Sequence, residues 1–452
     1  MSAPARSAFD AATTGTLGPW AKAVPVGAWG LDGAGWVATG PRLADLPTPV
    51  MTLDAAAVTA NLAAMAGWAG GAGVDLAPHG KTSMAPALWR AQLAAGSWAI
   101  TVATPWQLAV ALDAGVPRAL VAGPLLDADV HGLVARSPDA RVLAWVDGED
   151  VVAATAAARA EGLARTGGDP ERTRPLDVLV ELGAPGARTG ARSAAAALGV
   201  ARAAAAAPGL RLAGVAGYEG ALAHDASPAS MTAVRGWLRD LRSLHEELLA
   251  LGLLDDLRDA PGGAAVVSAG GSAYFDVVAE ELAALHDPAG RRGPAVRVVV
   301  RAGASAAHDD GFYAGITPAT RGTGPALRAG LHAWARVISR PEPGLALLDA
   351  GRRDLPFDEG LPVVRSRRPG GRGPAEPLEP GGAVVTAVND QHAFVRLAPG
   401  ARGAQHLAVG DVLQLGLSHP CTAFDKWGLV PVVDDASLPQ PQVVDLLRTV
   451  FG

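Results

Sequence analysis

The chain has 452 residues, of which 49% are apolar and 18% charged, so it is able to form a folded core and is not intrinsically disordered. Its 38 basic and 44 acidic residues leave a formal net charge of −6, which excludes a general electrostatic attraction to nucleic acid or to an anionic membrane. A single cysteine excludes a disulfide framework and is typical of a reducing, cytoplasmic compartment. We expect neither a membrane span nor a signal peptide, because the sequence has no sufficiently long uncharged apolar run.

Between about residues 45 and 305, short apolar runs alternate with Ala-rich stretches that are long enough for helices. The runs predict eight strands: Val74–Pro78, Trp98–Ala103, Ala119–Ala122, Arg141–Val146, Leu176–Glu181, Leu212–Tyr218, Ala264–Ser268 and Val296–Arg301. Helices are predicted between them, for example Pro105–Ala114, Ser193–Ala207 and Ser230–Leu251. Strands that are apolar throughout are buried on both faces, which favours a parallel (β/α)8 TIM-type barrel, although a doubly wound open sheet would give a similar pattern.

The remainder of the chain has the pattern of an antiparallel β domain, with short strands separated by Gly/Pro turns. The predicted strands are Leu331–Arg340, Leu345–Asp349, Ala383–Val388, Ala393–Leu397, Asp411–Leu417 and Leu429–Val433. Ser366–Gly382 has almost no apolar content and is expected to be a mobile surface loop. The predicted organisation of this α/β protein is an N-terminal extension (1–44), a barrel (45–310) and a C-terminal β domain (311–452).

Lysine occurs at only three positions, Lys22, Lys81 and Lys426, so any chemistry that needs a primary amine has three candidates. Lys81 follows the first predicted barrel strand, at the end of a barrel where active sites form. Desolvation there would lower the pKa of Lys81 and allow it to form a Schiff base with an aldehyde cofactor. The alternative is that Lys81 is an ordinary surface lysine without a catalytic role. His79 would orient this lysine or pack over a cofactor ring, or it is a structural histidine.

A Gly-rich turn ends the seventh predicted strand and enters a helix. The backbone N–H groups of Gly270 and Gly271 and the hydroxyl of Ser272 would together form a cradle for phosphate. By itself, a Gly-Gly-Ser turn usually has only a structural role and binds no phosphate. Together with Lys81 it indicates pyridoxal phosphate, which needs both a lysine and a phosphate site.

The only cysteine lies in Ser418–Thr422, two residues after a histidine. In an extended segment His419 and Cys421 point to the same side and would both reach one metal ion, and a thiolate with an imidazole favours zinc. A buried inert cysteine and a nucleophile are the other two interpretations, and the spacing does not decide among the three.

Two further side chains are candidates for contacts with a cofactor. Arg188 follows the fifth strand and has the planar fork that binds a carboxylate or a cofactor oxygen, while a solvated arginine is the alternative. Tyr218 ends the sixth strand, and this position is equally compatible with a cofactor contact and with a structural tyrosine of the core. The polar clusters His308–Asp310 and Asn389–His392 are compatible with turn chemistry as well as with a site.

In their order along the chain, several of these segments resemble the pyridoxal-phosphate enzymes with an alanine-racemase-type barrel, specifically the D-serine dehydratase and D-threonine aldolase branch. The matching stretches are Thr48–Asp54, Pro78–Thr82, Gly186–Gly190, Ser268–Ser272 and Ser418–Trp427. The most specific of them are His-Gly-Lys-Thr near the start and His-Pro-Cys-Thr followed by Phe-Asp-Lys-Trp near the end.

The resemblance implies a role for each candidate residue. Lys81 would be the Schiff-base lysine, Gly270, Gly271 and Ser272 would contact the phosphate, and Tyr218 and Arg188 would lie beside the cofactor. His419 and Cys421 would be ligands of zinc or another divalent metal. The family fold further implies a homodimer in which the β domain of one subunit closes the barrel mouth of the other. This sequence departs from the family at Ser305, where the pattern has an aromatic residue.

These observations predict a dehydratase that converts a D-configured β-hydroxy amino acid, such as D-serine, to a 2-oxo acid and ammonia. The alternative is an aldolase that uses the same cofactor and metal to cleave the Cα–Cβ bond, as in D-threonine. A racemase would need no metal. A non-enzymatic cofactor carrier would need neither the β domain nor the His419 and Cys421 pair.

Overall fold

Eight parallel strands form one sheet of the protein in the computed structural model, which describes residues 15–169, 172–258, 260, 263–291, 294–401 and 403–451. In chain order the strands are β2 (Asp75–Leu76), β3 (Ile100–Val102), β4 (Arg118–Val121), β5 (Arg141–Val146), β6 (Leu176–Leu182), β7 (Leu210–Gly217), β8 (Ala265–Ala269) and β9 (Val296–Val300). They lie in the order β2-β9-β8-β7-β6-β5-β4-β3. Each predicted barrel strand thus corresponds to one strand of this sheet.

The two ends of this sheet meet, and the sheet curls into a barrel. A parallel bridge between His79 and Thr101 joins the residues that follow β2 to β3. The same edge is held by backbone bonds from Trp98 N–H to the carbonyl of Leu76 at 2.7 Å and from Thr101 N–H to the carbonyl of Pro78 at 2.9 Å. The prediction of a barrel rather than an open sheet is confirmed.

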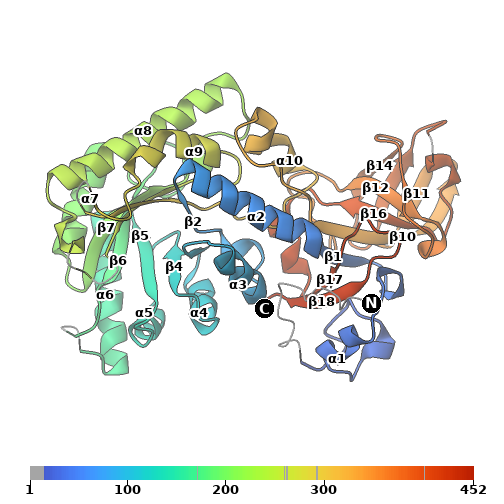
Figure 1. The fold of residues 1–452 in the computed structure, drawn as a ribbon, viewed down its shortest axis with the longest axis horizontal. Helices are drawn as coiled ribbons and strands as arrows, with labels where there is room; N and C mark the ends of the chain where they lie inside the picture. Colours follow the sequence, from blue (N-terminus) through green and yellow to red (C-terminus); the bar gives the residue numbers. More distant parts are fainter. Residues whose placement is uncertain are drawn as a thin grey trace.

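Helices follow the strands and surround the barrel, which lies at the left of Figure 1. They are α2 (Ala55–Ala72), α3 (Pro86–Ala94), α4 (Pro105–Asp113), α5 (Ala128–Ala135), α6 (Glu149–Thr166), α7 (Ala194–Ala206), α8 (Pro228–Ala250) and α9 (Phe275–Leu282). The side chains of Thr104, Ser193 and Ser227 cap α4, α7 and α8, because each accepts a hydrogen bond from a backbone N–H of the first turn. The helices α4, α7 and α8 confirm the three helices named from the sequence.

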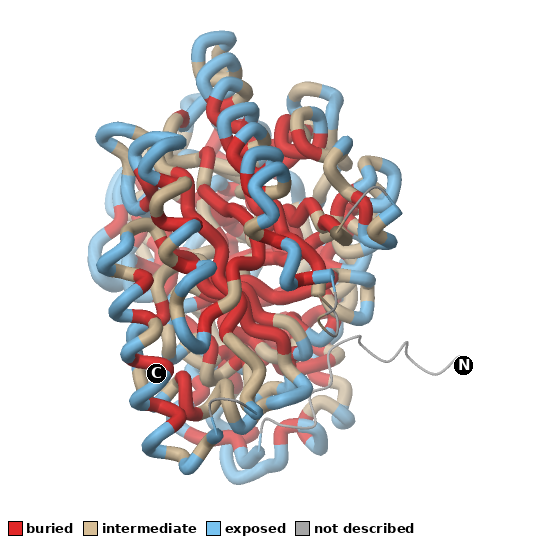
Figure 2. The backbone as a smooth tube through the Cα atoms, turned by 90° about the vertical axis from the view of Figure 1, so that its left-hand side faces the viewer, coloured by how far each residue is buried: buried red, intermediate tan, exposed pale blue. Residues whose placement is uncertain are grey.

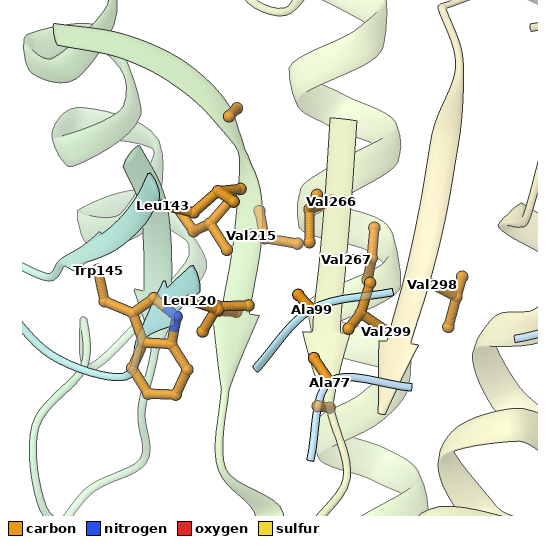
Figure 3. Close-up of a cluster of buried hydrophobic side chains, with 14 of the residues drawn as sticks. Ala77, Ala99, Leu120, Leu143, Trp145, Val215, Val266, Val267, Val298 and Val299 are labelled. Carbon is orange, nitrogen blue, oxygen red and sulfur yellow. The ribbon is translucent and has the colours of Figure 1, made fainter. Parts of the chain in front are cut away.

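The barrel strands are buried on both faces, as Figure 2 shows by the contrast between the central strands and the exposed outer turns of the helices. Figure 3 shows some of the apolar side chains involved, among them Leu120, Leu143 and Val215 from three different strands. All three are fully buried. The barrel is therefore a packed core, and its chemistry is restricted to the ends of the strands.

A second sheet, at the right of Figure 1, is mostly antiparallel and has the order β13-β12-β16-β10-β1-β17-β18, with β11, β15 and β14 continuing from β10. Its strands are β1 (Val50–Asp54), β10 (Leu331–Glu342), β11 (Leu345–Leu348), β12 (Val363–Arg368), β13 (Glu376–Pro377), β14 (Ala383–Val388), β15 (Ala393–Leu397), β16 (Val412–Gly416), β17 (Leu429–Val433) and β18 (Val443–Arg448). All six predicted strands of the β domain are present. Strand β1 also belongs to this sheet, so the sequence division at residue 45 does not coincide with the division between the two sheets.

The prediction of a loop over Ser366–Gly382 is wrong at its start, because Ser366 and Arg368 lie in β12 and are buried. Val364 is buried in the apolar core, but the buried residues of this strand that fall in the predicted loop are polar. The Ser366 hydroxyl donates to Oε1 of Gln414 at 2.9 Å, and Arg368 donates to the carbonyl of Pro439 at 2.8 Å. Hydrophobic patterning does not detect this half of the strand, because its buried positions are polar.

The described part of the N-terminal extension, which includes α1 (Gly33–Ala38), packs on the second sheet. Lys22 forms an ion pair with Asp354 at 2.8 Å, and its ammonium lies 3.8 Å from the ring centroid of Trp427. This contact connects the extension to the Phe-Asp-Lys-Trp motif. Among the described residues, no helix has the length and apolar character needed to span a membrane.

The core histidine His245 on α8 provides a test of the barrel's packing. Both of its ring nitrogens are buried without a hydrogen-bond partner, and desolvation lowers its pKa from 6.5 to about 4. Below pH 6.5 the His245 ring is protonated in the unfolded chain but stays neutral in the folded chain. The free energy of unfolding is therefore lost as the pH falls from 6.5 towards 4. We expect His245→Leu to reduce the loss of unfolding free energy between about pH 7.5 and about pH 5 by about 2 kcal/mol.

Denaturant unfolding of both proteins at the two pH values measures this difference. The matched control is His392→Leu at an exposed histidine, which should keep the full pH dependence. An equal loss of stability in the His245 variant and the native protein would show that this histidine is not the buried titrating group.

Candidate active site

Lys81 lies at the mouth of the barrel, on a tight turn (Gly80–Thr82) that follows β2. The turn packs closely against Trp89, since a Cβ at Gly80 would lie 2.9 Å from the indole. The Trp89 indole N–H donates to the carbonyl of Gly80 at 3.2 Å. Lys81 is exposed as a residue, but desolvation of its amine lowers its pKa. The charge of Arg188 lowers this pKa further, whereas that of Cys421 raises it. A larger neutral fraction of the amine is what a nucleophilic lysine needs.

The lone cysteine comes to the same turn from the other end of the chain. Cys421 lies on a short 3-10 helix (Pro420–Thr422), and its Sγ is 3.2 Å from Oγ1 of Thr82, the residue after Lys81. The two positions are separated by 339 residues in the sequence. The structure therefore brings the predicted lysine and the predicted thiol together within one chain.

His419 is held beside Cys421 by a carboxylate that the sequence did not single out. Its Nδ1 lies 2.7 Å from Oδ2 of Asp358, while the Thr422 hydroxyl donates to the other oxygen of Asp358 at 2.6 Å. Burial opposes a charge on the ring, but hydrogen bonds to Cys421 and Asp358 outweigh it and raise the pKa of His419 to about 9. Asp358 thus fixes the orientation of the imidazole, as carboxylates do for histidine ligands of metals.

The His419 and Cys421 side chains suit a divalent metal as a two-ligand set. Nitrogen and sulfur are the donors that zinc prefers, and a catalytic metal requires open positions for water or substrate. No group of three or more His, Cys, Asp or Glu side chains with metal-binding geometry occurs among the described residues. A metal at this place would therefore take at most two ligands from the described part of the chain.

Tyr218 and Arg188 face the same mouth. The guanidinium of Arg188 lies 4.7 Å from the ring centroid of Tyr218, a cation–π contact. On the other side the ring packs on Gly271, where a Cβ would lie 2.9 Å from Cε2 of Tyr218. The glycine is therefore needed for the position of the tyrosine.

The amides of Gly270 and Gly271, which the sequence predicts to contact a phosphate, have a partner within the protein. The buried carboxylate of Glu219 accepts both of them, at 2.9 Å from Gly270 N and 2.6 Å from Gly271 N. Their contact with a phosphate therefore stays a prediction, and it would compete with Glu219. Glu219 follows Tyr218 directly, but its partners lie about fifty residues further on.

Ser272 remains available at this turn. Its Oγ accepts the N–H of Ala304 at 3.1 Å, which leaves the hydroxyl hydrogen free to point to a phosphate oxygen. Arg301, at the end of β9, donates to Ser268 Oγ at 2.7 Å and to the carbonyl of Gly217 at 2.6 Å. Desolvation lowers the pKa of Arg301 to about 10, and the guanidinium forms a fixed positive charge under the mouth.

Two buried groups at the mouth lack partners for a polar atom. Nδ1 of His79 is one, and desolvation, together with the charge of Lys81, lowers the pKa of this histidine well below its usual value. Oε2 of Glu181 is the other; burial raises the pKa of its carboxyl group. Buried polar atoms of this kind are usually satisfied by a bound molecule or by water.

Comparison with known proteins agrees with this geometry. Residues 330–433 match the family described as "Putative serine dehydratase domain". A D-threonine aldolase of Arthrobacter sp is 30% identical over 404 residues, which cover 87% of this chain and 91% of the relative. The chain belongs to the D-serine dehydratase and D-threonine aldolase family. It is thus an enzyme of a family of pyridoxal-phosphate-dependent lyases.

Solved structures show the same fold. A D-threonine aldolase from Filomicrobium marinum has a TM-score of 0.71 and 24% identity, and the match covers 91% of this chain and 97% of that one. A cysteine-to-alanine variant of D-threo-3-hydroxyaspartate dehydratase in the metal-free form has a TM-score of 0.66 and 22% identity, covering 91% and 100% of the chains. The alanine-racemase-like barrel and the second sheet are features that this chain shares with the family.

The mouth fits the cofactor of the family. Lys81 would hold its aldehyde carbon, and Tyr218 and Arg188 would lie beside its ring. Ser272 would bind its phosphate, and the unpartnered Nδ1 of His79 is an atom that a bound group would satisfy. We infer these roles from the positions of the residues around one barrel mouth.

The polar clusters named from the sequence have structural roles. The Asp309 carboxylate accepts the N–H groups of Gly311, Tyr313 and Ala314 and so caps the short helix α10 (Phe312–Ile316). Asn389 and His392 bond to each other through their backbones in the turn between β14 and β15. The turn interpretation therefore holds for both clusters.

Lys81→Ala is the first test of the site. Without this amine the cofactor has no covalent attachment, so we expect the visible absorbance of the purified protein to disappear. Lys22→Ala and Lys426→Ala remove the other two lysines and should keep that absorbance. Absorbance spectra of the three variants after dialysis decide the point: colour that persists without Lys81 would assign the cofactor to another residue.

Proposed function

We propose that this protein is a pyridoxal-phosphate- and metal-dependent dehydratase that converts a D-configured β-hydroxy amino acid, such as D-serine, to a 2-oxo acid and ammonia. The observation that carries the proposal is the contact between the Lys81 turn and Cys421, with His419 beside it. It brings an amine and a nitrogen–sulfur pair, which would hold the metal, to the same barrel mouth. An α-proton and a β-hydroxyl are on adjacent carbons, so an enzyme that removes both needs its two sets of groups this close.

The residues of the barrel would bind the cofactor and move the α-proton. When bound, pyridoxal phosphate supplies an electron-withdrawing ring that stabilises negative charge at Cα. Lys81 would hold the cofactor before substrate arrives, and its free amine would then take the proton from Cα. Its lowered pKa favours the neutral, basic form of the amine.

The residues of the second sheet would act on the β-hydroxyl. His419 and Cys421 would hold a divalent metal, and zinc suits this donor pair. When bound, such an ion supplies Lewis acidity towards a hydroxyl oxygen. Asp358 would keep the imidazole oriented towards the ion, since it already binds Nδ1 of His419.

The proposal includes the assembly and location of the enzyme. We propose a homodimer, because the resemblance to the family implies that the β domain of one subunit closes the barrel mouth of the other. The single, partly buried cysteine at the site is compatible with a reducing cytoplasm, where its thiol stays available for metal.

An aldolase is the second candidate, because the relative from Arthrobacter sp and the structure from Filomicrobium marinum are both D-threonine aldolases. The same groups would then act on the Cα–Cβ bond. The dehydratase is preferred, because the Ser418–Trp427 stretch that carries His419 and Cys421 resembles the dehydratase side of the family more than the aldolase side.

Product analysis with D-serine and with D-threonine, in the presence of zinc, tests the function. We expect release of a 2-oxo acid and ammonia, because elimination of water leaves a product that hydrolyses to these two. Glycine and an aldehyde from D-threonine, without any oxo acid, would establish the aldolase instead. L-serine is the stereochemical control and should give no product.

Cys421→Ala tests the metal site. We expect zinc retained after dialysis to fall from one ion per chain to almost none, and elimination to fall by at least about 100-fold, because one of two ligands is lost. The cofactor absorbance should stay, since Lys81 is intact. As a control, the native enzyme should lose its activity with a chelator and recover it with zinc. Full activity of the variant in metal-free buffer would contradict a metal role.

A further inference from the structure

Tyr313 is a site residue that neither the sequence motifs nor the proposed roles include. It lies on α10, and its ring centroid is 5.9 Å from that of His419. Tyr313 therefore lies beside one of the two proposed metal ligands.

The backbone fixes Tyr313 in this position. Asp309 accepts its N–H at 3.2 Å, and the N–H of Phe312 donates to the carbonyl of Ser418 at 3.1 Å, one residue before His419. Gly311 allows this approach, because a Cβ there would lie 2.6 Å from Cα of Ser418. The tyrosine is thus held to the same segment that carries His419.

The phenol is a donor without a partner. No hydrogen bond of its oxygen occurs within the part of the chain that the structure describes, and the residue is only partly buried. A phenol is protonated at neutral pH, so the O–H of Tyr313 is available to a substrate oxygen beside His419.

We propose that Tyr313 is a catalytic residue that donates its phenolic proton to the β-hydroxyl oxygen as this group leaves. The inference rests on the proposed dehydratase function and adds the acid of the reaction. As the Cβ–O bond breaks, its electron pair stays on the oxygen, the proton of Tyr313 joins that oxygen, and water departs. The proton that Lys81 takes from Cα returns to the phenolate through solvent water, so both side chains end as they began. A weak acid is sufficient, because the departing hydroxide is a much stronger base than a phenolate.

The test compares two leaving groups in Tyr313→Phe. Hydroxide is a poor leaving group that is helped by a proton even beside a metal ion, whereas chloride leaves without one, so D-serine and 3-chloro-D-alanine separate an acid from a structural residue. We expect kcat for D-serine to fall by about 100-fold and kcat for 3-chloro-D-alanine to change by less than about twofold. Zinc content and cofactor absorbance should equal those of the native protein, since Tyr313 holds neither.

Tyr274→Phe is the matched control, because it removes another phenol, which donates to the carbonyl of Asp225 at 2.8 Å. It should leave the ratio of the two rates unchanged. If Tyr313→Phe slows both substrates equally, lowers zinc content, or changes neither rate, Tyr313 is not the acid. If the native enzyme eliminates 3-chloro-D-alanine but not D-serine, or eliminates neither, the proposed dehydratase function itself fails.

Discussion

The arrangement of the active site depends on one contact between the two sheets, that of Cys421 Sγ with Oγ1 of Thr82 at 3.2 Å. One partner belongs to the turn after the first barrel strand, and the other to a turn of the second sheet near the end of the chain. The apolar core of the second sheet extends to barrel helices, for example to Val58 on α2 and Leu88 on α3, and so holds the two sheets together away from the site. The lysine and the nitrogen–sulfur pair become one site only because these two turns meet.

A second connection makes this contact rigid. The segment that leaves β9 begins with Ala304, whose N–H is bound by Ser272 on the barrel side. It ends at Phe312, whose N–H is bound by Ser418 on the side of the second sheet. Between them, Asp310 donates its N–H to the carbonyl of Leu417 at 2.9 Å. Nine residues of chain, from Ala304 to Phe312, thus join the proposed phosphate site to the proposed metal site.

The sequence predicted the fold well where side chains are apolar, and poorly where polar groups form the structure. The eight barrel strands lie in mostly apolar runs, and these were found. Strand β12 escaped because Ser366 and Arg368 are buried with polar partners. In the site, Lys81, His419 and Cys421 were predictable as rare residues in specific motifs. Glu219 and Tyr313 were not, because their roles depend on partners that only the folded chain brings near.

The choice between the two proposed reactions turns on the proton of the same substrate oxygen. Elimination is helped by a proton delivered to the β-hydroxyl, since hydroxide is a poor leaving group, whereas cleavage of Cα–Cβ needs that proton removed. Next to His419 the chain provides Tyr313, whose phenol has no hydrogen-bond partner among the described residues. A phenol keeps its proton at neutral pH and serves as an acid more readily than as a base. The proposed role of Tyr313 is therefore consistent with elimination rather than aldol cleavage, even though the relatives include aldolases.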